Sequence, residues 1–267
     1  MGMKVALFAH SGRAEAVKAA QELDALLSER GVGVSEWTAP GDAELLVVLG
    51  GDGTILKAAH EVRDQGLPVL GVNLGHVGFL AEAERGDIAR VADAIARREY
   101  IVERRMAIEV HGSPTSEWAL NEFAISKAES SMVDLLVEVD GRPVSRWGCD
   151  GIIVATPTGS TAYAFSSGGP IIWPQVEAIA VVPVAAHALF DRPLVIGPES
   201  SVEITLLAGV GMITADGTRH QVLPIDQRIT IRPAATPVLL ARLAASPFTD
   251  RLVAKFRLPV DGWRGPA

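Results

Sequence analysis

The feature that most constrains the fold is a change of sequence pattern near residue 100. Before it, short β-rich runs alternate with segments of helical periodicity, as in βαβ units on a parallel sheet. After it, short strand-like runs follow one another, separated by Gly, Pro and Asp. We therefore predict a Rossmann-like α/β domain followed by an all-β, β-sandwich-like domain.

The predicted boundaries divide the 267 residues into two domains. Residues 1–99 form the α/β domain, and residues 100–244 form the β-rich domain. Helical periodicity returns over 247–256, so we assign residues 245–267 to the first domain, against which this tail can pack.

Individual elements follow from periodicity and turn signals. In the first domain we expect strands at 4–9, 32–37, 44–49 and 68–72, and helices at 15–30, from residue 54 onward and at 87–98. In the second we expect strands at 119–126, 133–139, 143–147, 151–155, 178–183, 201–206, 211–215 and 227–232. Asp140-Gly141 and Asp216-Gly217 are pairs that favour tight hairpin turns.

Charge and cysteine content narrow the class of protein. A net charge of -8 provides no basic surface for nucleic acid, so we expect no nucleic-acid partner. The single cysteine, Cys149, cannot form an intramolecular disulfide, which fits a reducing compartment. The N-terminus lacks a signal-peptide pattern, and no apolar run approaches the roughly 20 residues that span a bilayer. We expect a cytoplasmic protein without membrane attachment.

The sharpest local signal is Gly50-Gly51-Asp52-Gly53-Thr54, between an apolar strand and a helix. Ligands of open α/β sheets gather at the carboxyl ends of strands, and a helix N-terminus attracts phosphate. A carboxylate in such a loop suggests phosphoryl transfer, with Asp52 accepting a hydroxyl proton, holding magnesium, or both. The alternative is an ordinary strand-to-helix turn with Thr54 as N-cap.

A second signal runs from Asp150 to Pro170 and is rich in hydroxyl side chains, including those of Thr161, Tyr163 and Ser166. Small donors and acceptors at this density can bind a ribose and the edge of an adenine. The alternative is a Ser/Thr-rich turn region without a ligand.

These motifs, in this order, resemble the NAD kinase family of the bacterial ATP/polyphosphate type. The resemblance covers nearly the whole chain and includes GGDGT, LNEFAISK, DGIIVATPTGSTAYAFSSGGP and HALFDRP. GGDGT alone is also typical of diacylglycerol and sphingosine kinases, whereas the TPTGSTAY block is far more specific. The resemblance implies a phosphofructokinase-like α/β domain and transfer of a phosphoryl group from ATP, or alternatively inorganic polyphosphate, to the adenosine 2'-hydroxyl of NAD, giving NADP.

Site residues follow from the matched motifs. The resemblance implies that Asp52 is the catalytic proton acceptor. It implies a nucleotide- and phosphate-binding set of Gly50, Gly51, Gly53, Thr54, Lys57, Asn121, Glu122, Gly148, Asp150, Thr161, Ala162, Tyr163, Ala164, Phe165, Ser166 and Ala185. Lys57 could instead be a solvated helix residue, and Asn121 and Glu122 could be polar residues at a strand edge.

The resemblance carries further expectations about donor, metal and assembly. Gly148 stands where relatives that also accept polyphosphate tend to have Gly, although it could simply relax a strand end. Mg²⁺ is expected to arrive with the donor phosphates, without a metal site built from protein side chains alone. A homodimer or homotetramer is expected, with Ala185 often contributed to a neighbouring subunit's site. His187 is interpreted as part of a buried structural turn.

Two other functions compete with this interpretation. A diacylglycerol-type lipid kinase would share the GGDGT loop, but the sequence lacks a basic patch or membrane-facing amphipathic helix. A regulator that binds NAD(P) without phosphorylating it would keep the binding residues, although an intact Asp52 argues against it.

Overall fold

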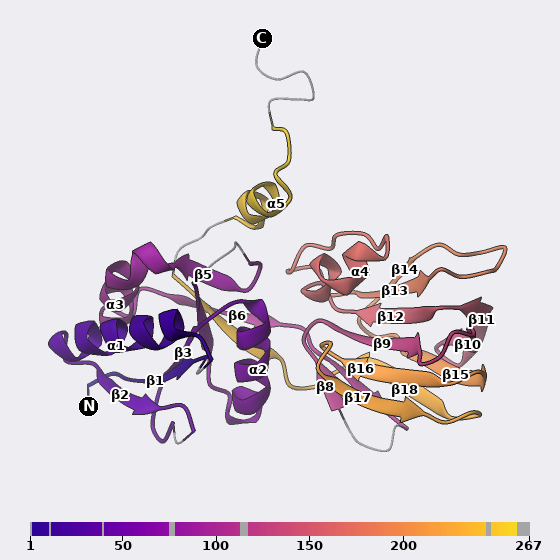
Figure 1. The fold of residues 1–267 in the computed structure, drawn as a ribbon, viewed down its shortest axis with the longest axis horizontal. Helices are drawn as coiled ribbons and strands as arrows, with labels where there is room; N and C mark the ends of the chain where they lie inside the picture. The colour runs from indigo at the N-terminus through magenta and orange to yellow at the C-terminus, as the bar shows by residue number, and fades with distance from the viewer. Residues whose placement is uncertain are drawn as a thin grey trace, which may run out of the picture. The chain divides into compact units, whose positions relative to one another are not determined.

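The chain folds into two compact units, drawn in Figure 1. The computed structural model describes residues 2–10, 12–38, 40–74, 78–112, 117–243 and 247–260. The first unit comprises Met1–Arg104 and Val238–Ala267, and the second comprises Arg105–Pro237.

The first unit contains a seven-stranded sheet in the order β2-β1-β3-β4-β19-β6, with β5 also paired to β4. Its strands are β1 Lys4–Ala9, β2 Gly33–Glu36, β3 Leu45–Leu49, β4 Val69–Asn73, β5 Ala81–Glu84, β6 Ile101–Arg105 and β19 Val238–Arg242. Strands β1 to β5 and β19 pair in parallel. Strand β3 is buried at every residue, as expected for a central parallel strand covered on both faces.

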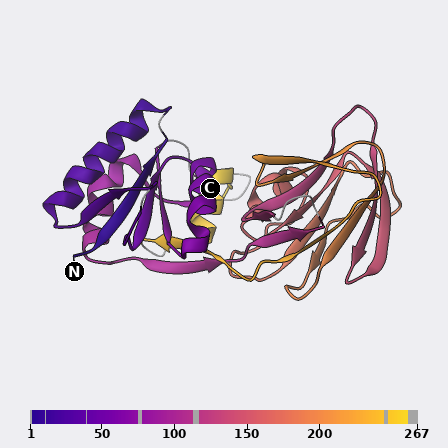
Figure 2. The ribbon, with the colours of Figure 1, turned by 90° about the horizontal axis from the view of Figure 1, so that it is seen from below.

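Helices cover both faces of this sheet, as Figures 1 and 2 show. Helices α1 Ala14–Glu29 and α3 Ile88–Ala96 cover one face and α2 Asp52–Val62 covers the other. Helix α5 Phe248–Phe256 follows β19, and short 3₁₀ turns lie at Arg63–Gln65 and Arg85–Asp87. Leu23 of α1 and Ile95 of α3 share one core cluster with alternate residues of the strands. Helix α2 packs against β3 and β4 from the other side, where Ile55 fills the space left by Gly71.

The second unit consists of two six-stranded antiparallel sheets. One has the order β11-β10-β15-β18-β7-β8, formed by β7 Ile108–His111, β8 Glu117–Ala119, β10 Val133–Val139, β11 Arg142–Cys149, β15 Val202–Ala208 and β18 Arg228–Pro233. The other has the order β14-β13-β12-β9-β16-β17, formed by β9 Glu122–Lys127, β12 Gly151–Ala155, β13 Ile179–Val184, β14 Leu194–Ile196, β16 Gly211–Ala215 and β17 Arg219–Leu223. A 3₁₀ turn at Gly159–Thr161 and the one-turn helix α4 Tyr163–Ser166 follow β12.

A single apolar core lies between the two sheets. It includes the fully buried Trp147 and Leu135 from the first sheet, and Phe123 and Ile152 from the second. Alternate residues of each strand point into it, which is the physical basis of a β-sandwich. The predicted fold class, an α/β domain with a β-sandwich-like domain, is confirmed.

Both predicted hairpin turns are present. Asp140-Gly141 joins β10 to β11, and Asp216-Gly217 lies between β16 and β17; all four residues have positive φ, as a type I′ turn requires. The expected start of a helix at residue 54 was wrong, because α2 begins at Asp52 with Gly51 as N-cap. Thr54 is therefore inside the first turn and is not the cap.

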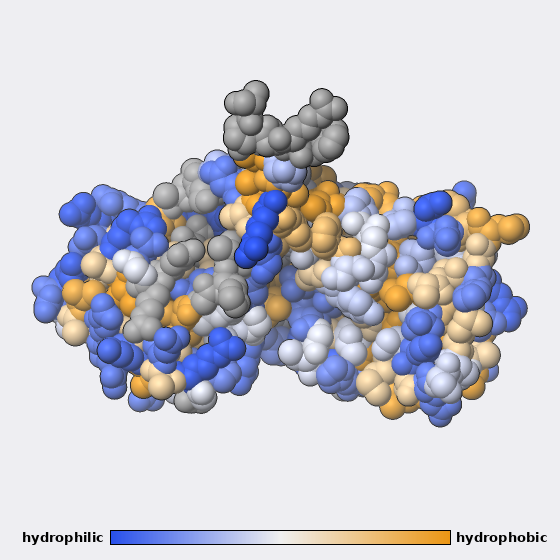
Figure 3. Space-filling model, turned by 45° about the horizontal axis from the view of Figure 1, so that its top comes forward, coloured by the Kyte–Doolittle hydropathy of each residue, from blue (hydrophilic) through white to orange (hydrophobic). Residues whose placement is uncertain are grey.

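The surface shown in Figure 3 is mostly hydrophilic, with smaller hydrophobic areas between. In the described part of the chain, no helix combines the length and apolar character needed to cross a membrane.

Candidate active site

A cleft in the first unit opens at the carboxyl ends of β1 and β3. Strand β1 has β2 on one side and β3 on the other. The strands after β2 are therefore added to the sheet on the opposite side of β1, although all of them run parallel. Such a switch point is where open α/β sheets bind ligands. The cleft has a volume of about 580 Å³ and is lined by Phe8, Ala9, His10, Arg13, Trp37, Gly51, Gly53, Thr54 and Lys57.

The lining of this cleft suits an anion. Arg13 and Lys57 are exposed cationic side chains, and His10 adds an imidazole. Gly51 and Gly53 have open space where a Cβ would stand, so a ligand can approach the backbone closely. The first N–H groups of α2 lack partners within the helix and carry a partial positive charge. In a chain of net charge -8, this is a local concentration of groups that suit an anion such as phosphate.

The side chain of Asp52 is held by backbone N–H groups. Its Oδ2 accepts from the N–H of Phe79 at 3.0 Å and its Oδ1 from the N–H of Leu80 at 3.2 Å. A Cβ on Gly78 would lie 2.1 Å from Oδ1, so residue 78 must be Gly for the carboxylate to occupy this position. The half-buried carboxylate is therefore oriented by the segment that follows β4. Each of its oxygens keeps a further lone pair for a ligand.

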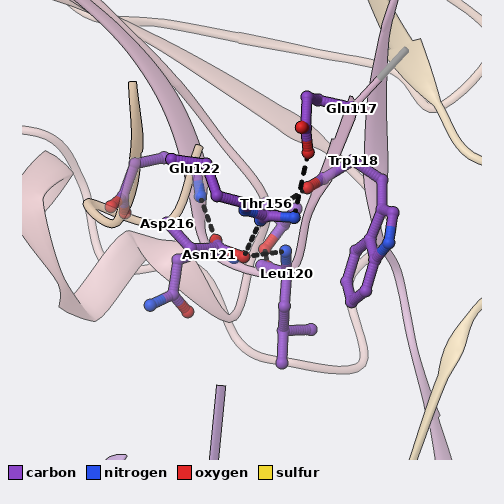
Figure 4. A network of polar contacts seen from close by, with 8 residues as sticks. Glu117, Trp118, Leu120, Asn121, Glu122, Thr156 and Asp216 are labelled. Atoms are coloured by element: carbon purple, nitrogen blue, oxygen red, sulfur yellow. Dashed lines mark hydrogen bonds and ion pairs between the residues drawn. The ribbon is translucent and has the colours of Figure 1, made fainter. Parts of the chain in front are cut away.

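Asp216 organises the start of β9 in the second unit, as Figure 4 shows. Its Oδ1 accepts from the N–H of Asn121 at 2.7 Å and of Glu122 at 3.3 Å, and its Oδ2 from the N–H of Leu120 at 3.1 Å. Arg219 bridges Asp216, at 3.2 Å, and Glu117, at 3.1 Å. The side-chain amide of Asn121 extends away from these bonds. Asp216 is therefore more than a turn residue, because it fixes the backbone of both predicted ligand-binding residues.

Glu122 carries an unusual carboxyl group. It is only 6% exposed, and its Oε2 is buried without a hydrogen-bond partner in the described part of the chain. Burial, and secondly repulsion from Asp216, raise the pKa of Glu122 to about 8, while the N–H of Tyr163 acts in the opposite direction. An orphaned buried oxygen is costly, and binding sites are where proteins retain one. Glu122 therefore remains a predicted ligand-binding residue.

The hydroxyl-rich segment after β12 is largely occupied with its own structure. Thr156 donates to the carbonyl of Leu120 at 2.5 Å, and Ser160 donates to the carbonyl of Pro157 at 2.6 Å. A Cβ on Gly159 would collide with the carbonyl of Asn121, so the loop lies directly on the Asn121–Glu122 backbone. These buried hydroxyls support the loop and are not exposed to a ligand.

Residues 161–166 present a mixed surface. Tyr163, Phe165 and Ser166 are exposed, and Thr161 and Ala162 are half-buried. Ala164 is fully buried in a small core cluster with Ile153, so only its backbone can face a ligand.

The predicted nucleotide residues form two groups at opposite ends of β12. Ala155 pairs with Glu122 at one end, and Gly151 pairs with Val184 at the other. Asp150 and Ala185 thus lie at the second end, about 16 Å from the first for five strand residues. The Asp150 carboxylate forms an ion pair with Lys127 at 2.6 Å, and Ala185 is exposed with a φ of +48°.

Gly148 and His187 also belong to this second group. The carbonyl of Gly148 accepts from the N–H of His187 at 2.8 Å. His187 is exposed, so the expectation of a buried turn at this residue was wrong, because the segment after β13 runs along the surface. A Cβ on Gly148 would meet no atom closer than 4.0 Å, so packing alone does not require glycine there.

Sequence reasoning missed three parts of this arrangement. The segment Gly78 to Leu80 binds the Asp52 carboxylate, and a glycine soon after a buried strand was the available signal. Arg13 lines the cleft but belongs to no motif. The role of Asp216 depends on a contact with residues nearly a hundred positions away, which no local pattern indicates.

Comparison with known proteins agrees with this geometry. Residues 34–100 match the family model described as the ATP-NAD kinase N-terminal domain, and residues 120–243 match the ATP-NAD kinase C-terminal domain. The chain is 49% identical to an NAD kinase of Thermobifida fusca, covering 98% of this chain and 92% of the relative. It is 48% identical to NAD kinase 2 of Streptomyces coelicolor, covering 98% and 96%.

Two solved structures share the fold. A yeast NADH kinase complexed with NADH superimposes with a TM-score of 0.86 at 23% identity, covering 97% of this chain and 89% of that one. An NAD kinase from Archaeoglobus fulgidus in complex with ATP gives a TM-score of 0.76 at 30% identity, covering 96% and 99%. Both family models and the near-full-length relatives thus rule out the lipid-kinase alternative: the chain belongs to the NAD kinase family.

Proposed function

We propose that this chain transfers a phosphoryl group to the adenosine 2'-hydroxyl of NAD, with Asp52 accepting the hydroxyl proton. The observation that carries the proposal is the position of Asp52 between two glycines that line a cationic cleft. Its carboxylate is held in a defined orientation by two N–H groups. A fixed acceptor next to a phosphate site is what in-line phosphoryl transfer needs from the protein.

The donor phosphates bind in the 580 Å³ cleft in this proposal. Lys57 and Arg13 neutralise phosphate oxygens, while the N-terminus of α2 binds them through N–H groups. Because these contacts recognise phosphate and not a base, they suit both ATP and a polyphosphate. Gly148 remains the predicted position that admits polyphosphate.

Magnesium fits this site as a companion of the donor. The cleft is lined by cations and backbone groups, a donor set for phosphate and not for a bare divalent ion. In the described residues, no group of three or more His, Cys, Asp or Glu side chains could hold a metal. When bound, Mg²⁺ neutralises the donor's phosphate oxygens; the chain itself orients the donor and accepts the proton.

The nucleoside parts of NAD are assigned to the second unit. Glu122 Oε2 is buried without a partner among the described residues and can bind a ribose hydroxyl, beside the side-chain amide of Asn121. Residues 161–166 provide exposed aromatic and hydroxyl groups for the adenosine.

We further propose a homo-oligomer, as a dimer or tetramer, in the cytoplasm. Asp150 and Ala185 lie at the opposite end of β12 from Glu122, too far away to contact the same nucleoside. In this proposal, each NAD site is therefore completed by Asp150 and Ala185 of a neighbouring copy. Leu189, close to Ala185, is fully exposed, and a subunit contact would cover it.

The test is a coupled assay of NADP formation from NAD with Mg²⁺ and either ATP or polyphosphate. Asp52→Asn should lower kcat by about 10² to 10⁴, the usual contribution of a general base. Asp64→Asn, an exposed carboxylate just beyond α2, is the matched control and should keep wild-type turnover. Absence of NADP from either donor, with NAD binding intact, would instead support the non-catalytic regulator.

A further inference from the structure

The C-terminal helix α5 packs against the segment that holds Asp52. The ring of Phe79 lies between two rings of α5, with centroid distances of 5.8 Å to both Phe248 and Phe256. Phe248 and Arg251 are three residues apart and lie on the same side of this nine-residue helix, which is yellow in Figure 1. Helix α5 therefore contacts Phe79 through two aromatic rings and through the side chain of Arg251.

Arg251 is a buried cation, with 7% of the residue exposed. Its Nη1 donates to the carbonyl of Phe79 at 3.3 Å and to the carbonyl of Ala81 at 3.4 Å. Burying a guanidinium is costly unless it is well hydrogen-bonded, whereas an apolar residue would pack α5 against Phe79 without that cost. The buried guanidinium therefore ties α5 to the backbone of the segment that follows β4.

One residue connects the two sets of bonds. Phe79 donates its N–H to Oδ2 of Asp52 and offers its C=O to Arg251. A rotation of the peptide planes around Phe79 would break both bonds. The positions of Asp52, Phe79 and Arg251 are thus mechanically linked within the first unit, although they are distant in the sequence.

We infer that Arg251 is a positioning residue for phosphoryl transfer, which holds the Asp52 carboxylate in its reactive orientation through the backbone of Phe79. The inference rests on the proposed role of Asp52. It makes the C-terminal helix part of the catalytic apparatus without contact between Arg251 and either substrate. Its effect should fall on kcat, because a small displacement of a catalytic group slows the chemical step and leaves substrate binding intact.

The test is a double-mutant cycle on the full-length chain. Arg251→Ala should lower kcat by about 10- to 100-fold, with the KM values for NAD and ATP within about twofold of wild type. In the Asp52→Asn background the same change should have no further effect, because no carboxylate remains to be positioned. NADP from these slow variants is quantified chromatographically after long incubations.

Two controls separate positioning from general loosening of the helix. Val253→Ala trims a half-buried side chain of α5 and keeps Arg251 and both aromatic rings, so it should lower the melting temperature and leave kcat near wild type. Guanidinium at millimolar concentration should restore part of the kcat of Arg251→Ala, compared with sodium at equal ionic strength. If Arg251→Ala does not fold, Arg251→Lys keeps the charge without the planar fork and should lose about threefold or more in kcat.

Specific results overturn the inference. An unchanged kcat in Arg251→Ala, an equal loss in the Asp52→Asn background, or an absence of guanidinium rescue each contradicts it. The proposed function fails separately, if Asp52→Asn itself turns over like wild type.

Discussion

Glu122 should make the stability of the protein depend on pH in a way that Glu122→Gln removes. The pKa of this carboxyl is raised from 4.5 to about 8, first by burial and second by the nearby Asp216. Between these two pH values the folded state retains a proton that the unfolded state has lost. The favourable contribution is therefore complete below pH 4.5 and is lost as pH rises toward 8.

The magnitude follows from the size of the pKa change. Each pH unit in this window lowers the free energy of unfolding by about 1.4 kcal/mol, so the loss approaches roughly 5 kcal/mol at pH 8. Glutamine keeps the shape of the neutral acid and does not ionise. Relative to wild type, the variant should thus gain stability progressively from pH 5 to pH 8, while its affinity for NAD should fall.

Urea unfolding followed by tryptophan fluorescence at pH 5, 6.5 and 8 measures this difference. Glu129→Gln, which changes an exposed carboxylate, is the control and should follow the wild-type pH dependence. Parallel curves for wild type and Glu122→Gln would refute the reasoning, because they would show that Glu122 titrates alike in the folded and unfolded states.

Three further substitutions test the site. Asp216→Ala leaves three N–H groups without their acceptor, so we expect a loss of about 2–4 kcal/mol in the free energy of unfolding and a higher KM for NAD. Chemical denaturation and steady-state kinetics measure both, and an unchanged KM would contradict the supporting role. Lys57→Met should raise the KM for ATP about tenfold without changing that for NAD, whereas Lys18→Met, on the exposed side of α1, should change neither. Gly78→Ala places a methyl 2.1 Å from the Asp52 carboxylate, so kcat should fall about 100-fold while circular dichroism stays native; full activity would show that this orientation is not needed.

Sequence periodicity located most elements because those signals are local. Strands β1, β10, β12 and β16 have the predicted bounds, since alternation or continuous apolar runs between turn residues mark them directly. Strands β5, β6, β7, β14, β17 and β19 were not predicted as strands. These are short or partly exposed segments, and their conformation depends on a neighbouring strand. Strand β19, for example, completes a sheet whose other members lie far earlier in the chain.

For the candidate site too, local motifs indicated some features and only the folded structure showed others. The motifs identified the family, because Gly, Asp and hydroxyl residues at fixed spacing have few other uses, and they predict that Asp52 is the proton acceptor. They could not show that the hydroxyl groups of Thr156 and Ser160 donate hydrogen bonds to backbone carbonyls of the protein itself. Nor could they show that Asp150 lies at the opposite end of β12 from Glu122.

The amino-acid sequence by itself determined the two-part fold class and the family, and it predicts which residues carry the chemistry. Only the tertiary structure decided how those residues are supported: Asp52 by the N–H groups of residues 79 and 80, and Glu122 beside Asp216. The physical reason is the separation along the chain over which each interaction acts. Periodicity and turn preferences act between neighbours in the chain, whereas burial, desolvation and hydrogen bonds to distant backbone groups exist only once the chain has folded.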